Sequence, residues 1–197
     1  MKTLNIETAT NLLHEKMKNK NLRRHCYAVG KVLHAYHDFY EREDRDVDSL
    51  SANEWEIVGL LHDSYYEITK DDWSLHTVML LEWLKDYEVK DEMLNVFRSH
   101  NTKITNLRNP ETLLEWTLEC SDELTGFIVA VALVMPGKNL DEVTVERVLK
   151  RFKQKEFARA VDRSQIMQCV EKVNVPVDKF VEIALDAMKQ NSELLGL

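Results

Sequence analysis

The 197-residue sequence has few of the residues that interrupt helices, with only five glycines and three prolines. It also has few cysteines: Cys26, Cys120 and Cys169 make an odd number without a CxxC spacing. This pattern argues against a disulfide framework and against a zinc site built on thiolates, and it favours a reducing, cytoplasmic location. Low-complexity tracts and internal repeats are absent as well, which argues against a disordered chain or a solenoid.

Long apolar segments are also missing from the sequence. The most apolar run, residues 124–135, is too short to cross a bilayer and is typical of a buried helix. Residues 1–16 lack the apolar core of a signal peptide. The net charge of −8 disfavours binding to nucleic acid polymers, because that binding depends largely on lysine and arginine contacts to phosphates. We therefore expect neither a membrane nor a nucleic acid polymer as a partner.

The remaining composition, 44% hydrophobic and 30% charged, is typical of a helical domain. Apolar residues recur at helical spacing, and no alternating pattern predicts a β-strand. Ser51 and Glu54 form a capping box before one helix, and Asn109 and Pro110 are suited to begin another. We predict an all-α single domain with helices over residues 8–18, 21–40, 52–62, 74–86, 91–101, 110–135, 143–153, 157–171 and 177–195.

Three polar side chains fall on apolar faces of the predicted helices. Asp122 lies one turn after Leu118, where an ionised carboxylate needs a partner, a proton or a metal ion. His100 lies one turn after Val96, and His25 shares its face with apolar neighbours. Taken singly, each residue has a simpler structural explanation, as a polar tie between helices or as a histidine satisfied within the core.

The dipeptide His62-Asp63 ends the predicted helix over 52–62, where the chain turns and both side chains can converge on one ion. Together with His25 and Asp122, it supplies imidazoles and carboxylates without a thiolate. This ligand chemistry suits Mn, Fe, Co, Ni, Zn or Mg, and no HExxH motif offers a rival site. We therefore predict that His25, His62, Asp63 and Asp122 bind a divalent metal ion.

In this order and on helices, the four residues resemble the H…HD…D signature of the HD superfamily of metal-dependent phosphohydrolases. The chain is similar over nearly all its length to small stand-alone bacterial proteins described as HD-superfamily hydrolases, particularly in GLLHDSYYE, SDELTGFIVAVALVMP and VERVLKRFKQKEFARAVDR. The resemblance implies one HD-type helical bundle of about seven to nine helices over residues 1–197. Its metal-binding core would span about 21–135, with C-terminal helices over 140–197 packed on it.

The chain departs from the family where Ser64 and Tyr65 follow the HD pair, and it lacks the Gly-Tyr-Pro signature of cyclic-dinucleotide phosphodiesterases. The subgroup therefore stays open. By the same resemblance, His76 and His100 would extend the ligand set to a site for one or two ions. His76 follows a polar segment, so it could instead be a surface histidine. Trp73 is expected to border a cleft.

The resemblance implies that His62 and Asp63 act in catalysis, with Asp63 bridging two ions or orienting a water molecule. Glu67 and Glu123 are candidates to hold ligand imidazoles through hydrogen bonds. The remaining histidines match no position of the signature, and we expect them to be ordinary surface residues; they are His14, His34 and His37.

The expected activity is hydrolysis of a phosphoester in a small metabolite, by preference a nucleotide, through a metal-activated water. Lys103 and Arg108, after His100, and Lys150 and Lys153, in a basic stretch, are candidate phosphate ligands, although a solvated helix face explains most of that stretch. Two alternatives stay open: a di-iron oxygenase of HD type and a non-catalytic metal-binding regulatory module. The substrate, the metal and a homodimeric state are also open.

Overall fold

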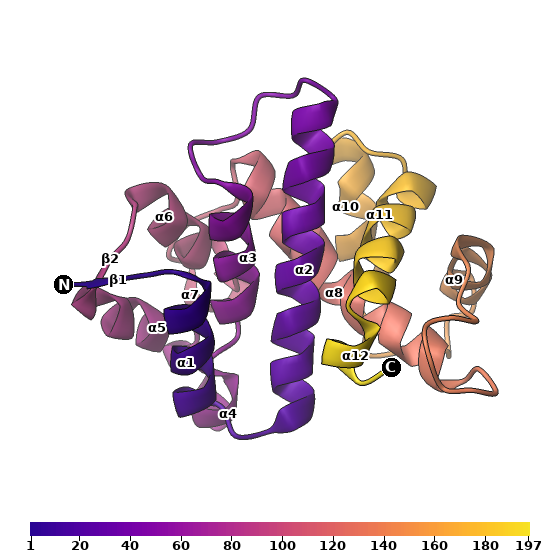
Figure 1. Cartoon of the computed structure of the whole chain (residues 1–197), viewed down its shortest axis with the longest axis horizontal. Helices are drawn as coiled ribbons and strands as arrows, with labels where there is room; N and C mark the ends of the chain where they lie inside the picture. Colours follow the sequence, from indigo (N-terminus) through magenta and orange to yellow (C-terminus); the bar gives the residue numbers. More distant parts are fainter.

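The computed structural model describes residues 1–197, and its chain is almost entirely helical (Figure 1). The longer helices are α1 (Ile6–Lys16), α2 (Lys20–Arg42), α3 (Ala52–Leu61), α6 (Asp91–Ser99), α8 (Leu113–Leu133), α9 (Val145–Phe152), α10 (Arg163–Lys172) and α11 (Val177–Gln190). Shorter segments connect or extend them: α4 (Tyr66–Thr69), η1 (Trp73–Leu75), α5 (Val78–Trp83), η2 (Leu84–Asp86), α7 (Thr102–Thr105) and α12 (Ser192–Leu195). No helix is both long and apolar enough to span a membrane.

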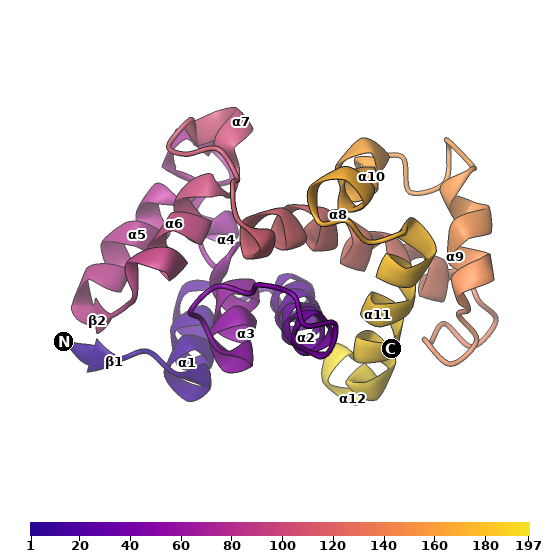
Figure 2. The same cartoon turned by 90° about the horizontal axis from the view of Figure 1, so that it is seen from above.

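Helices α2 and α8 form the centre of the molecule. Figure 2 views α2 nearly end-on while α8 runs across the picture, so the two helices cross steeply. Helices α1, α3, α5 and α6 lie on one side of this crossing, and α9 to α12 lie on the other (Figures 1 and 2). The buried hydrophobic side chains form one continuous cluster of 45 residues, which confirms the predicted all-α single domain.

The packing of α2 against α3 depends on two glycines. A Cβ atom at Gly59 would lie 2.5 Å from the Cα atom of Gly30, well inside van der Waals contact. Backbone atoms cannot give way as a flexible side chain can, so any larger residue would push the helices apart. Because α2 carries His25 and α3 ends just before His62, this contact helps to set the distance between the two histidines.

The residues that begin α3 agree with the prediction from the sequence, and those that begin α8 do not. The predicted capping box of Ser51 and Glu54 begins α3. Helix α8 begins with a second capping box, in which Thr112 accepts a hydrogen bond from the N–H of Glu115 and Glu115 accepts one from the N–H of Thr112. The prediction that Asn109 caps this helix was therefore wrong by three residues, because the box satisfies the backbone N–H groups of Thr112 and Glu115.

The predicted helix over 74–86 is broken into η1, α5 and η2. The break lies at Thr77, which has a φ of 64°, a strained value for a β-branched residue. Its hydroxyl shares a hydrogen bond with that of Tyr65 and donates another to the carbonyl of His100. These tertiary contacts, which helical periodicity cannot reveal, hold the chain out of helical conformation.

Three further differences from the predicted secondary structure are local. A parallel strand pair, β1 (Lys2–Thr3) and β2 (Tyr87–Glu88), joins the N-terminus to the end of η2. Strands of this length are too short to show alternating hydrophobicity, so the sequence carried no sign of them. The predicted helix over 177–195 is divided into α11 and α12. The predicted helix over 157–171 begins only at Arg163, because Asp162 caps α10 there.

Candidate metal centre

The structure brings the four residues of the H…HD…D pattern together. His25 comes from α2, His62 and Asp63 follow the end of α3, and Asp122 comes from the middle of α8. One potential ligand atom from each lies within 4.8 Å of the others. The Asp122 carboxylate is 2.9 Å from Nε2 of His25 and 3.5 Å from Nε2 of His62. Three separate helices therefore converge on one point at the crossing of α2 and α8.

The imidazole of His62 is held with one nitrogen free. Its Nδ1 atom lies 2.7 Å from the carbonyl oxygen of Gly59, which can only accept, so Nδ1 carries the proton and donates. Its Nε2 atom is buried, has no hydrogen-bond partner, and lies 3.8 Å from the Asp63 carboxylate. The lone pair of Nε2 therefore points among carboxylates, as a metal ligand requires.

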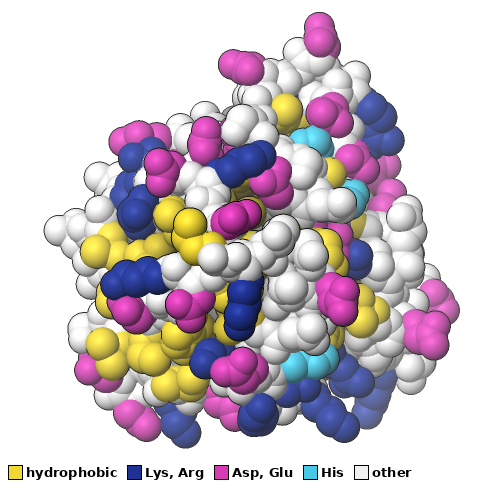
Figure 3. All heavy atoms as spheres, turned by 60° about the vertical axis from the view of Figure 1, so that its left-hand side comes forward, with side chains coloured by type: hydrophobic (Ala, Val, Ile, Leu, Met, Phe, Trp, Pro, Cys, Tyr) yellow, Lys and Arg dark blue, Asp and Glu magenta, His cyan; other side chains and the backbone are white.

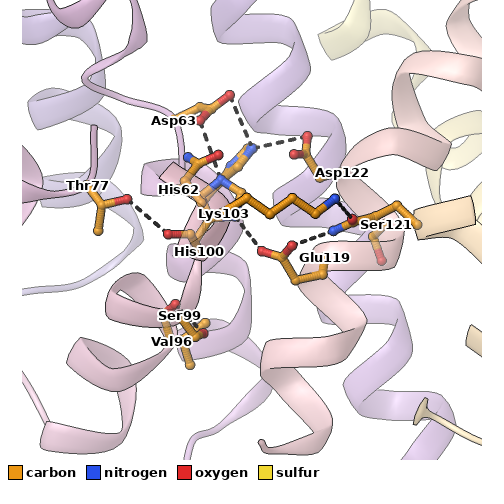
Figure 4. Close-up of polar contacts among 12 residues, drawn as sticks. His62, Asp63, Thr77, Val96, Ser99, His100, Lys103, Glu119, Ser121 and Asp122 are labelled. Carbon is orange, nitrogen blue, oxygen red and sulfur yellow. Dashed lines mark hydrogen bonds and ion pairs between the residues drawn. The ribbon is translucent and has the colours of Figure 1, made fainter. Parts of the chain in front are cut away.

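His100 is arranged in the same way next to His62, with its ring centre 5.2 Å from that of His62. Its Nδ1 atom donates to the Glu119 carboxylate over 2.9 Å, and its Nε2 atom lies 3.5 Å from Asp63 without a hydrogen bond. The amide of Gln165 donates to the second oxygen of Glu119. Figure 4 shows the imidazoles of His62 and His100 joined by dashed lines to the two oxygens of the Asp63 carboxylate. A carboxylate that accepts a hydrogen bond from an imidazole, as Glu119 does from His100, fixes the orientation of the ring and raises its strength as a ligand.

His76 is buried, so it is not the surface histidine that its polar neighbours in the sequence allowed. Its ring stacks on Trp73 at 4.5 Å and meets the edges of Tyr65 and Tyr66. Its Nε2 atom has no hydrogen-bond partner. Neither His76 nor His100 belongs to the group of four that could share one ion, although His100 reaches Asp63. Trp73 is half exposed beside His76.

The charges of the site stabilise one another. Burial alone would raise the pKa of Asp122, but a hydrogen bond from His25 and the charges of the nearby His25 and His62 imidazoles hold it well below its usual value. Burial would lower the pKa values of His25 and His100, yet the neighbouring carboxylates raise both. The pKa of His76 is lowered, mainly by burial. Carboxylates at the centre therefore stay ionised and attract positive charge, whether protons or a metal ion.

Glu119 was missed from the sequence, although a signal was present. It precedes Asp122 by three residues, so the two carboxylates share one face of α8. The two glutamates predicted to support ligand imidazoles accept hydrogen bonds from backbone N–H groups instead. Glu67 accepts hydrogen bonds from the N–H groups of Lys18 and Asn19, and Glu123 accepts one from the N–H of Asp162. Because each is engaged by backbone groups, the prediction for Glu67 and Glu123 was wrong.

The four basic candidates are widely separated. Lys103 donates to Gln165 over 2.9 Å, next to the Glu119 carboxylate, so it lies beside the metal centre (Figure 4). Arg108 is engaged in ion pairs with Glu111 and Glu115. Lys150 and Lys153 are exposed at the end of α9, at one edge of the molecule in Figure 2.

Figure 3 shows lysine, arginine, aspartate and glutamate side chains interspersed on one face of the molecule. In the basic stretch, Arg163 donates hydrogen bonds to backbone carbonyls of the preceding loop, among them those of Phe152 and Gln154. Arg163 thus has a structural function in closing that loop.

A second group of potential ligands lies farther along α2. His37, Asp38 and Glu41 each offer an atom within 4.8 Å of the others. His37 is buried, contrary to the expectation of a surface residue: its Nε2 atom donates to the carbonyl of Leu50 and its ring packs against Trp55. Its function as an anchor for the loop before α3 accounts for this burial.

Comparisons with protein-family models, with curated proteins and with solved structures found no match. The function of the centre must therefore be inferred from its residues and their geometry.

Proposed function

We propose that this chain is a metal-dependent phosphohydrolase of HD type, which hydrolyses a phosphoester of a small metabolite and has a nucleotide as its leading candidate substrate. One observation carries the proposal: the buried Nε2 atoms of His62, His76 and His100 all lack a hydrogen-bond partner. Each such atom costs about 1–3 kcal/mol, and protein interiors rarely keep unsatisfied polar groups. A divalent cation would accept these lone pairs and remove that cost.

The residues present fit such an ion. His25, His62, Asp63 and Asp122 would hold one ion with two imidazoles and two carboxylates, a donor set suited to Mn, Fe, Co, Ni or Zn. A second ion would be held on the other side of Asp63 by His100 and His76. Asp63 would serve both positions, because His62 and His100 lie within 4 Å of its two carboxylate oxygens.

A divalent ion at this site would lower the pKa of a water molecule toward neutrality and stabilise charge on a phosphoryl oxygen. The surrounding side chains would orient the water and hold the phosphate. Asp63 would accept a hydrogen bond from this water and orient it for in-line attack on phosphorus. His62 and His100 are kept in place by Gly59 and Glu119. Lys103 supplies a positive charge at the edge of the site for the phosphate.

The test is the metal content of purified protein, measured by inductively coupled plasma mass spectrometry after reconstitution with Mn, Fe, Ni or Zn. We expect about two ions per chain in the wild type, a loss of both in Asp122→Asn, and about one in His100→Gln. Asp38→Asn is the control, because this exposed carboxylate belongs to the second group on α2. Hydrolysis of nucleotides and other small phosphoesters should require the ions and disappear in Asp122→Asn.

The same measurement separates the other candidate functions. Absence of metal in the wild type after every reconstitution would refute the proposal. Iron with a mixed-valent electron paramagnetic resonance signal and oxygen consumption would indicate a di-iron oxygenase. Stoichiometric metal without turnover of phosphoesters or oxygen would indicate a regulatory module.

A further inference from the structure

A cavity of about 380 Å³ opens beside His25. Its walls come from three parts of the chain: the first half of α2, the second half of α8 and the last three residues. Apolar side chains such as Ala28, Val129 and Leu195 form much of its lining. The volume lies within the range of small-molecule sites, which are typically apolar with a few polar groups. Because His25 forms part of the wall, the cavity lies next to the candidate metal centre.

Gly126, a glycine in the middle of α8, is one of the residues that line the cavity. It follows Asp122 by four residues, so the two positions lie on the same face of α8. A Cβ atom at Gly126 would meet no other atom within 4 Å. The backbone there has ordinary helical geometry, and glycine costs about 1 kcal/mol relative to alanine in such a position. Neither packing nor backbone conformation thus requires glycine, whereas the open space beside it does depend on the missing side chain.

Arg24 supplies a positive charge at the same cavity. Its guanidinium group lies against the backbone of Gly196, where a Cβ atom would overlap it. Arg24 forms no ion pair with an acidic side chain. The lysines and arginines that do form such pairs are Lys16, Lys31, Lys85, Lys90, Lys103, Arg108 and Lys179. The guanidinium of Arg24 is therefore free to bind an anion.

We propose that this cavity binds the organic group of an anionic phosphate ester, that the group is compact and largely apolar, such as an aromatic ring, and that Gly126 sets its maximum size. Arg24 contacts the anionic part where the cavity meets the metal centre. This inference rests on the proposed function, because it takes the reacting phosphate to lie at the ions beside His25.

The experiment compares phenylphosphonate with methylphosphonate, which carry the same charged group and cannot be hydrolysed as esters. Their dissociation constants are measured by isothermal titration calorimetry on metal-loaded wild type, Gly126→Ala and Gly126→Leu. We expect the wild type to bind the phenyl compound roughly tenfold more tightly than the methyl compound. Gly126→Leu should remove this preference, and Gly126→Ala should reduce it in part.

Glu146→Leu is the matched control, because it adds a leucine to the exposed surface of α9 and should keep the preference. Arg24→Gln should weaken both phosphonates by roughly tenfold, because it removes a charged contact to the common group. Gly126→Ala should also raise the midpoint of thermal unfolding, which keeps the test valid if the leucine variant folds poorly. Equal binding of the two phosphonates by the wild type, or a preference that survives in Gly126→Leu, would overturn the inference.

Metal content is measured on every sample, and the titrations are repeated on metal-free protein. A wild type that binds no metal but still prefers the phenyl compound would refute the proposed function and leave the cavity assignment standing. Bound metal and phosphoester turnover without a phenyl preference would support the proposed function and refute the cavity assignment.

Discussion

Helix α8 carries three carboxylates on one face, and the two at the ends of this row have different surroundings. Glu115, in the first turn, is fully buried and fully satisfied: it accepts hydrogen bonds from the N–H groups of Glu111 and Thr112 and from Arg108. Asp122, two turns later, has no backbone donor and faces His25 and His62 instead. One helix therefore holds a carboxylate of the protein framework and a carboxylate of the candidate site.

The difference shows that burial alone does not mark a functional carboxylate, because the chemistry of the partners decides. Arg108 keeps its proton throughout the physiological range and can only donate, so the site at Glu115 is closed to a cation. A histidine can lose its proton and present a lone pair, so the site at Asp122 can exchange protons for a metal ion. Glu119 lies between them and supports the site indirectly through His100.

The largest expected effect on stability is that of Glu115, the carboxylate in the first turn of α8. Glu115→Gln should lower the free energy of unfolding by about 2–3 kcal/mol, because it leaves the Arg108 charge without its buried partner. Urea denaturation followed by circular dichroism measures this loss. The metal content should equal that of the wild type.

The control for this variant is Glu111→Gln, which also contacts Arg108 but through an exposed side chain. Its effect should stay below about 1 kcal/mol. Loss of metal from Glu115→Gln while the protein stays folded would show that the two ends of α8 cannot be separated in this way.

Glu119, the middle carboxylate of the row, should give an intermediate effect. This effect is on metal affinity rather than on stability. Glu119→Gln should weaken metal binding by about 10–100-fold, because the His100 imidazole loses the charge behind it and a single amide oxygen cannot accept from both His100 and Gln165 as the carboxylate does. A competition titration against a chromophoric chelator measures the affinity. Glu123→Gln is the matched control on the same helix, because Glu123 contacts the backbone of Asp162 and no histidine. Unchanged affinity in Glu119→Gln would remove His100 from the ligand set.

The smallest expected effect is a dependence of stability on pH in metal-free protein. The pKa values of His25 and His100 are raised in the folded state, so their contribution is complete below about pH 6.5 and is lost as pH rises through the folded values. The pKa of Asp122 is depressed, so its contribution is lost only in acid. Between about pH 6 and about pH 9 the stability should therefore fall by about 1 kcal/mol.

Urea denaturation in the presence of a chelator measures this dependence. Asp122→Asn should reduce it, because the carboxylate that raises the pKa of His25 is gone, whereas Glu111→Gln should leave it unchanged. A metal-free wild type that becomes more stable over the same range would contradict the assigned charge states. Metal binding should strengthen with rising pH, because the ligand imidazoles must be neutral.

Much of the candidate site could be predicted because its residues obey the geometry of single helices. His25 and Asp122 stand at positions where helical spacing directs a side chain inward, and the His62-Asp63 pair comes directly after a helix whose capping box is local. The partners of these residues could not be predicted in this way. Glu119 was overlooked and Glu67 was misassigned, because each contact joins segments distant in sequence.

The sequence by itself determined that the chain is helical and which side chains of each helix face inward, because both follow from a repeat of 3.6 residues. Only the tertiary structure decided how closely the helices approach, as at Gly30 and Gly59. It also decided where Thr77 interrupts a helix and which imidazole nitrogens are left without a partner. Distances between helices arise from the packing of residues far apart in the chain, and periodicity carries no information about them.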